Sequence, residues 1–164
     1  MEERILGIDP GLNITGYGVL ARTPRGPKLE EAGVVRGGSG GPIPPRLNKI
    51  HKSLEEVISS LKPSAVAIEQ LYSHYKRPRT SILMRHARGV ICLVAAQHDI
   101  PVFDYAATNV KKLLTGNGRA PKSQMQNAVQ RELALSKVPE PADVADALAI
   151  ALCHFYSKTQ VVVR

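Results

Sequence analysis

Long hydrophobic runs, cysteine-rich segments and internal repeats are all missing from this chain of 164 residues. No apolar run approaches the ~18 residues that a membrane-spanning helix needs, and the N-terminal residues 1–4 provide no basic head of the kind that opens a signal peptide. The two cysteines, Cys92 and Cys153, lack metal-ligand spacing and are too few for a disulfide framework. These absences predict a cytoplasmic protein in which both thiols stay reduced.

Acidic residues are fewer than basic ones, and two segments of the chain have none. The chain has 14 Asp and Glu against 22 Lys and Arg, which gives a formal net charge of +8. No acid occurs between Glu69 and Asp99, and none occurs from Tyr105 to Arg131. The basic residues in these two segments are Lys76, Arg77, Arg79, Arg85, Arg88, Lys111, Lys112, Arg119, Lys122 and Arg131. A solvated helix face explains one such segment, whereas two of them favour a polyanionic partner such as nucleic acid.

The length is that of one domain, residues 1–164, with a hydrophobic core. The hydrophobic periodicity predicts strands over 4–9, 15–22, 28–36, 64–70 and 101–105, and helices over 47–61, 80–97, 108–114, 122–135 and 142–157. Turn sequences between the first three strands predict an antiparallel meander. The alternation of helices and strands that follows favours an α/β domain, with a mixed five-stranded sheet flanked by helices. Gly89 is expected to mark close packing of its helix.

Four carboxylates stand where an apolar segment ends or a helix begins. Asp9 and Glu69 each end an apolar strand, and Asp143 and Asp146 open a helix rich in Ala and Leu. A carboxylate at the end of a buried strand loses hydration, which is costly unless a cation or hydrogen bonds replace the water. Each acid alone has a structural explanation, as a turn former, a strand end or a helix start. Their joint occurrence beside basic segments predicts a metal-dependent phosphodiesterase.

Acids drawn from separate elements suit hard ions such as magnesium or manganese, which prefer oxygen ligands. Two ions about 4 Å apart activate water and stabilise the departing oxygen of a phosphodiester. We expect Asp9 to bridge both ions, Glu69, Asp143 and Asp146 to complete the coordination, and Lys122 to offset charge on the scissile phosphate. Without metal these carboxylates repel one another, so raised carboxylate pKa values are expected.

Seven motifs resemble the RuvC family of bacterial Holliday-junction resolvases, in order and over nearly the whole chain. They are Gly7-Ile8-Asp9-Pro10-Gly11, Thr15-Gly16-Tyr17-Gly18-Val19, Ala67-Ile68-Glu69-Gln70, Ala87-Arg88-Gly89-Val90, Val110-Lys111, Lys122-Ser123-Gln124 and Asp143-Val144-Ala145-Asp146-Ala147-Leu148-Ala149. This resemblance implies the ribonuclease H-like (retroviral-integrase) fold, a two-fold homodimer, magnesium-dependent symmetric nicking of four-way DNA junctions, and RuvA and RuvB as partners.

The resemblance also implies roles for particular residues. The four acids match the family's metal-binding catalytic acids, and the family accepts histidine at the position of Asp143. Lys111 and Lys122 match essential DNA-contacting lysines. Tyr72 stands near the position where well-known relatives carry a phenylalanine that wedges or stacks at the junction centre, with Tyr75 nearby. The expected DNA contacts are Tyr72, Lys76, Arg77, Arg79, Lys111, Arg119 and Lys122.

Three other functions fit parts of the sequence. The Asp-Pro-Gly and Thr-Gly segment resembles phosphate-binding loops of sugar kinases and actin-like ATPases, but those enzymes need a second related domain to close on nucleotide. A non-catalytic junction binder would use the acids only to hold a structural ion. A ribonuclease H would use the same acids on an RNA–DNA hybrid.

Overall fold

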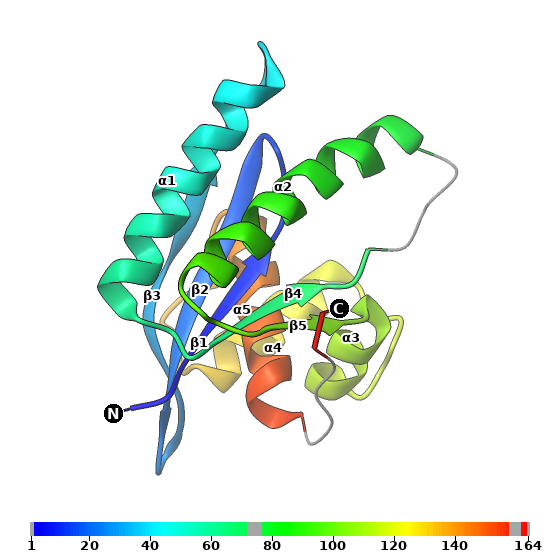
Figure 1. Ribbon diagram of the computed structural model, residues 1–164. Coiled ribbons are helices and arrows are strands. Elements are labelled where there is room, and N and C mark those ends of the chain that lie inside the picture. Colours follow the sequence, from blue (N-terminus) through cyan, green and yellow to red (C-terminus); the bar gives the residue numbers. More distant parts are fainter. Residues whose placement is uncertain (1, 72–76, 158–161, 164) are drawn as a thin grey trace.

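The computed structural model describes residues 2–71, 77–157 and 162–163. The strands are β1 (Arg4–Asp9), β2 (Ile14–Thr23), β3 (Gly26–Arg36), β4 (Ala65–Glu69) and β5 (Val102–Tyr105). The helices are α1 (Ile43–Leu61), α2 (Pro78–Gln97), α3 (Ala107–Thr115), α4 (Lys122–Glu132) and α5 (Ala142–Tyr156). The strands form one sheet in the order β3-β2-β1-β4-β5, shown in Figure 1. The first three strands are antiparallel, and β4 and β5 continue the sheet parallel to β1. The predicted meander and mixed five-stranded sheet are confirmed.

Element boundaries follow local backbone chemistry. Proline lies at the first turn or the N-cap of four helices, where its missing N–H breaks no helical hydrogen bond. These prolines include Pro44 in α1, Pro78 in α2, Pro121 before α4 and Pro141 before α5. The predicted 122–135 helix ends at residue 132, because Ala134 has a left-handed φ of 50° that no α-helix continues through.

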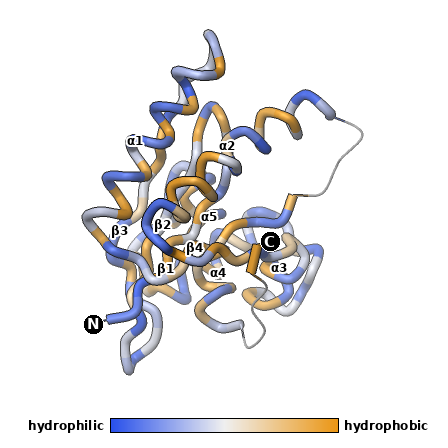
Figure 2. Tube along the Cα trace, in the orientation of Figure 1, coloured by the Kyte–Doolittle hydropathy of each residue, from blue (hydrophilic) through white to orange (hydrophobic). Residues whose placement is uncertain are grey.

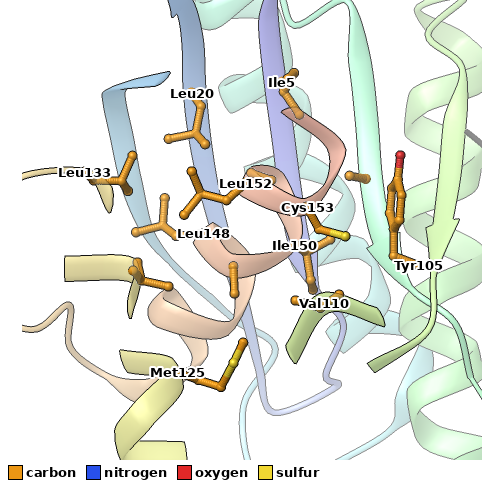
Figure 3. Close-up of a cluster of buried hydrophobic side chains, with 14 of the residues drawn as sticks. Ile5, Leu20, Tyr105, Val110, Met125, Leu133, Leu148, Ile150, Leu152 and Cys153 are labelled. Atoms are coloured by element: carbon orange, nitrogen blue, oxygen red, sulfur yellow. The ribbon is translucent and has the colours of Figure 1, made fainter. Parts of the chain in front are cut away.

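Helices cover both faces of the sheet (Figure 1). Helices α1 and α2 bury residues such as Ile50 and Ile91 against one face. On the other face α5 lies against the sheet and is itself covered by α3 and α4, which explains why it is buried on nearly every side. Figure 3 shows Leu148 and Leu152 of α5 beside Leu20 of β2 in this second cluster.

Hydrophobic residues of the helices gather on the side that packs against the sheet (Figure 2). None of the helices in the described part of the chain is long and apolar enough to cross a membrane. In α2, Ala87, Ile91 and Val94 are the side that packs inward, and Gly89 lies on the exposed side of the helix. A Cβ at Gly89 would meet nothing within 4 Å, so the prediction of close packing there is wrong for contacts within the chain.

Glycines in the central strands let α5 lie directly on the backbone of the sheet. A Cβ on Gly7 of β1 would lie 2.2 Å from the main-chain oxygen of Ala147. A Cβ on Gly16 of β2 would lie 2.1 Å from the main-chain oxygen of Asp143. Gly16 is also the residue of β2 that pairs with Asp9. This close approach brings the N-terminal turn of α5 to the end of β1.

Gly16→Ala is therefore expected to destabilise the fold, because the new methyl group would lie within the van der Waals radius of a main-chain oxygen. Overpacking of this kind typically costs about 1–3 kcal/mol. Urea unfolding would measure the loss. Gly40→Ala is the matched control, since a Cβ at Gly40 has nothing within 4 Å. Equal stability of the two variants would contradict the close contact between Gly16 and α5.

Candidate active site

Two neighbouring parallel strands bring Asp9 and Glu69 together. In the register of β1 and β4, Ile8 pairs with Ile68. Asp9 and Glu69 are the next residues of these two strands, so their carboxylates leave the sheet at the same end. The first turns of α5 carry Asp143 and Asp146, and α5 packs on β1 and β2.

The carboxylates affect one another strongly. The pKa of Asp9 is raised from 3.8 to about 8, first by burial and then by the negative charges of Asp146, Glu69 and Asp143. Burial, followed by the charge of Asp146, also raises the pKa of Glu69. Burial is again the main cause for Asp146, with a further contribution from Asp143. The expected increase in carboxylate pKa values is confirmed for these three acids.

Two lysines lie beside the acids. Lys122, the first residue of α4, places its Nζ 3.8 Å from Oδ2 of Asp146. The positive charge of Lys111, in α3, offsets part of the increase in the pKa of both Glu69 and Asp146. These four residues share the wall of a hollow of about 260 Å³, whose apolar side includes Met125. Negative and positive groups therefore meet in one concave site that a phosphate can approach.

The donors of this site fit hard divalent ions. Asp9, Glu69, Asp143 and Asp146 offer carboxylate oxygens only, the ligand type that magnesium and manganese prefer. Their burial and mutual repulsion, seen in the pKa of Asp9, are what a bound cation would relieve. Among the residues the structure describes, no group of three or more His, Cys, Asp or Glu side chains is already close enough to hold a metal ion. The four carboxylates therefore need side-chain adjustment to share one ion.

The turn that follows Asp9 is held in place by Thr15. The Thr15 hydroxyl donates to the main-chain oxygen of Gly11 at 2.6 Å and accepts from the Gly11 N–H at 3.3 Å. Thr15 is fully buried. The segment that resembles a nucleotide phosphate loop thus uses its threonine hydroxyl to close its own turn.

The other predicted DNA contacts in the described residues do not line the hollow. Arg77 and Arg79 are exposed at the N-terminal end of α2, and Arg119 is exposed between α3 and α4. Tyr72 and Lys76 lie outside the described residues. The structure brings Lys111 and Lys122 to the acids but gives none of these three arginines a place in the wall of the hollow.

The sequence analysis grouped Arg88 with the residues that favour a polyanionic partner and missed its contacts inside the protein. Its guanidinium donates to the main-chain oxygen of Glu69 at 3.1 Å and to Oδ1 of Asp104 at 2.5 Å. A buried polar pair was also missed, in which the Tyr105 hydroxyl lies 2.6 Å from Nδ1 of His154. Neither contact has a local sequence signal, because 16 to 49 residues separate the partners along the chain.

Comparison with known proteins agrees with this geometry. The family model described as "Crossover junction endodeoxyribonuclease RuvC" matches residues 5–154. A relative of that name from Rhodopirellula baltica is 58% identical over 154 residues, which cover 93% of this chain and 85% of the relative. The structure of Thermus thermophilus RuvC superimposes with a TM-score of 0.89 at 33% identity, over 98% of this chain and 99% of that one.

The same Thermus protein has also been solved in complex with its Holliday junction substrate. That structure matches with a TM-score of 0.88 at 32% identity, over 98% of this chain and 99% of that chain. The family match, the curated relative and the two structures agree over almost the full chain. This protein belongs to the RuvC family of crossover junction endodeoxyribonucleases.

Proposed function

We propose that this chain resolves four-way Holliday junctions by paired symmetric nicks, in homologous recombination and DNA repair, and that residues 1–164 act as one nuclease domain. The observation that carries the proposal is the group of partly buried carboxylates with two lysines beside them, in a member of the RuvC family. Asp9, Glu69, Asp143 and Asp146 are the proposed catalytic and metal-binding residues. The ion is magnesium, which manganese can replace, with two ions per site.

Divalent ions bound there would polarise the scissile phosphate and supply an activated water. The protein's own contribution is position and charge. Asp9 and Glu69 are held by adjacent strands, which fixes the spacing of the two carboxylates. Lys122 and Lys111 place positive charge on the side of the hollow where phosphate oxygens arrive, and their ammonium groups donate hydrogen bonds to those oxygens.

A metal-dependent cleavage assay tests this function. A labelled four-way junction, a linear duplex of the same sequence and an RNA–DNA hybrid are incubated with magnesium. Symmetric nicks in the junction alone are expected. Preferred cleavage of the hybrid would indicate a ribonuclease H, and junction binding without nicks would indicate a structural binder. ATP added with an equal concentration of magnesium, which compensates for chelation of the metal, should not change nicking. A nucleotide-dependent activity would instead indicate a sugar kinase or an actin-like ATPase.

DNA contacts outside the acids are proposed for seven residues: Tyr72, Lys76, Arg77, Arg79, Lys111, Arg119 and Lys122. Phosphate contacts by Lys and Arg release counterions, so junction affinity should fall steeply as salt rises. Tyr72 is proposed to stack on a strained or unpaired base.

Arg79→Ala is expected to flatten the log–log salt dependence of junction binding by about one unit, because it removes one phosphate contact. Arg25→Ala is the matched control. Arg25 is also exposed, but it lies in the β2–β3 hairpin at the opposite end of the sheet from Asp9. Binding titrations at several salt concentrations give the slopes. If both variants keep the wild-type slope, Arg79 belongs to a solvated helix face.

A homodimer would supply two active sites related by a two-fold axis, as two symmetric nicks require. The exposed side of α2 is the proposed interface. Ile82 is 56% exposed and Leu93 is 52% exposed. Gly89 lies between them at helical spacing, and a Cβ there would have no neighbour, so another backbone can approach closely. In Figure 1 the N-terminal part of α2 extends out past the sheet, where a second copy has access to it.

Leu93→Asp is expected to convert this dimer to monomer, because a charge would be buried in an apolar contact. Sedimentation velocity of the wild type and the variant measures the change. Leu113→Asp is the control, since Leu113 is also exposed but belongs to α3. A wild type that sediments as a monomer at working concentrations, yet cuts both strands of a junction, would rule out the dimer.

The family resemblance further supports action in the cytoplasm, where bacterial DNA lies, together with RuvA and RuvB. Co-sedimentation of the protein with a RuvA–RuvB–junction complex, compared with the junction alone, would test the partnership.

A further inference from the structure

Arg88 connects α2 to the strand that ends in Glu69. Arg88 lies near the middle of α2, and its side chain is only 17% exposed. One guanidinium nitrogen donates to the Glu69 carbonyl at 3.1 Å. The other donates to the carboxylate of Asp104, which is 19% exposed, at 2.5 Å. A charged side chain that is this well covered is used inside the protein and is not available to DNA.

Arg88 contacts the main chain of Glu69 from the face of the sheet that α1 and α2 cover. Asp104 pairs with Ile68 in the parallel register of β4 and β5, so both side chains point to the face that α1 and α2 cover. Glu69 is one residue further along β4, and its carboxylate points to the opposite face, toward α5 and the lysines. Arg88 therefore holds the main chain of Glu69 on one face while the carboxylate acts on the other.

We propose that Arg88 is a positioning residue for Glu69, with Asp104 as its anchor. Glu69 is the last residue of β4, and the Gln70 N–H that follows donates to the main-chain oxygen of Tyr105 at 2.8 Å. The peptide group between Glu69 and Gln70 is thus held at its N–H by Tyr105 and at its carbonyl oxygen by the Arg88 guanidinium. The guanidinium, anchored on Asp104, thereby limits rotation of the strand end and the range of positions that the Glu69 carboxylate can take. Lysine has a single charged nitrogen and cannot hold both acceptors in the same rigid geometry.

The proposal rests on Glu69 being part of the catalytic site. Arg88→Ala should then weaken divalent-ion binding, because one carboxylate ligand is no longer held in place. Residues that orient metal ligands typically contribute about 10–100-fold to metal affinity or activity. We expect the magnesium concentration at half-maximal nicking to rise by about tenfold. Junction affinity in metal-free buffer should stay within twofold.

The experiment compares Arg88→Ala, Arg88→Lys and Asp104→Asn with the full-length wild type. Manganese titration by calorimetry, without DNA, reads ion binding apart from activity. Arg88→Lys should recover part of the affinity, and Asp104→Asn should give a smaller loss in the same direction, even if Arg88→Ala does not fold. Arg22→Ala is the matched control, because Arg22 also donates to a carboxylate, that of Glu3, and to a main-chain oxygen, at the far end of the sheet.

A double-mutant cycle separates positioning from general stability. In a Glu69→Gln background, Arg88→Ala should cause no further loss of manganese affinity, because the ligand that Arg88 orients is already gone. Wild-type ion binding in all three variants, or loss of thermal stability alone, would overturn the role of Arg88. If Glu69→Gln itself leaves nicking and ion binding unchanged, the proposed catalytic site fails instead.

Discussion

Asp9→Asn is expected to abolish nicking of a four-way junction while junction binding survives. Asparagine keeps the size of the side chain and one acceptor oxygen, but it removes the negative charge that holds a divalent ion. Metal ions contribute several kcal/mol to transition-state stabilisation in phosphodiester hydrolysis. A loss of about 4 kcal/mol corresponds to roughly a thousandfold in rate. In metal-free buffer above about pH 8, where the Asp9 carboxylate is ionised, the variant is expected to bind the junction more tightly, because one negative charge is gone from the place that the scissile phosphate approaches. At lower pH the wild-type carboxyl group keeps its proton, so the two affinities should converge.

Nicking under single-turnover conditions and a parallel binding titration measure the two effects. Glu69→Gln and Asp146→Asn should behave like Asp9→Asn, since both acids lie with the lysines in the wall of the hollow. Asp143→His should keep part of the activity, more with manganese than with magnesium, because manganese accepts nitrogen ligands better. Nicking by Asp9→Asn at the wild-type rate, with contaminating nuclease excluded, would refute the assignment of the site.

The grouping of the acids was predictable, because two of them stand at strand ends and two at the start of one helix. Asp9 and Glu69 each end an apolar strand, and parallel pairing of β1 with β4 places them side by side. The i,i+3 spacing of Asp143 and Asp146 puts both on one face of α5. Short-range patterns also predicted the antiparallel meander, whose strands follow one another along the chain. The mixed five-stranded sheet was predicted from the order of strands and helices instead, since its parallel pairs join distant residues such as Ile5 and Ala65.

The support of the site was not predictable in the same way. The closeness of α5 to the sheet depends on Gly7 and Gly16, which look like ordinary strand glycines until the helix is placed over them. Arg88 was counted as part of a basic surface, because nothing local indicates that it contacts Glu69 and Asp104. Contacts of this kind depend on how a helix is placed over the sheet, and hydrophobic periodicity carries no information about that placement.

The stability of the metal-free protein should fall as the pH rises, and Asp9→Asn should remove much of that fall. In the folded protein the pKa of Asp9 is raised from 3.8 to about 8 by burial and by the other three acids. Between about pH 4 and pH 8 the folded state therefore keeps a proton that the unfolded chain has released. Stability decreases wherever the folded state binds more protons, by up to about 1.4 kcal/mol per pH unit for one group.

Asparagine does not titrate, so in EDTA the stability advantage of Asp9→Asn over the wild type should grow from pH 5 to pH 8. The repulsion is shared with Glu69 and Asp146, whose pKa values are also raised, so the total gain should be a few kcal/mol. Urea unfolding at pH 5, 6.5 and 8 would measure it. Asp99→Asn is the control, because Asp99 is exposed at the opposite end of the sheet, and asparagine tolerates its left-handed φ of 56°.

Magnesium should reverse the order of stability at pH 8. A bound cation stabilises the ionised carboxylates and competes with the proton on Asp9, so it should raise the stability of the wild type far more than that of Asp9→Asn. The apparent magnesium affinity of the wild type should accordingly increase from pH 6 to pH 8.5. Parallel stability curves for the two proteins in EDTA, together with equal stabilisation by magnesium, would show that the charge of Asp9 is neither destabilising in the metal-free fold nor used to hold the ion.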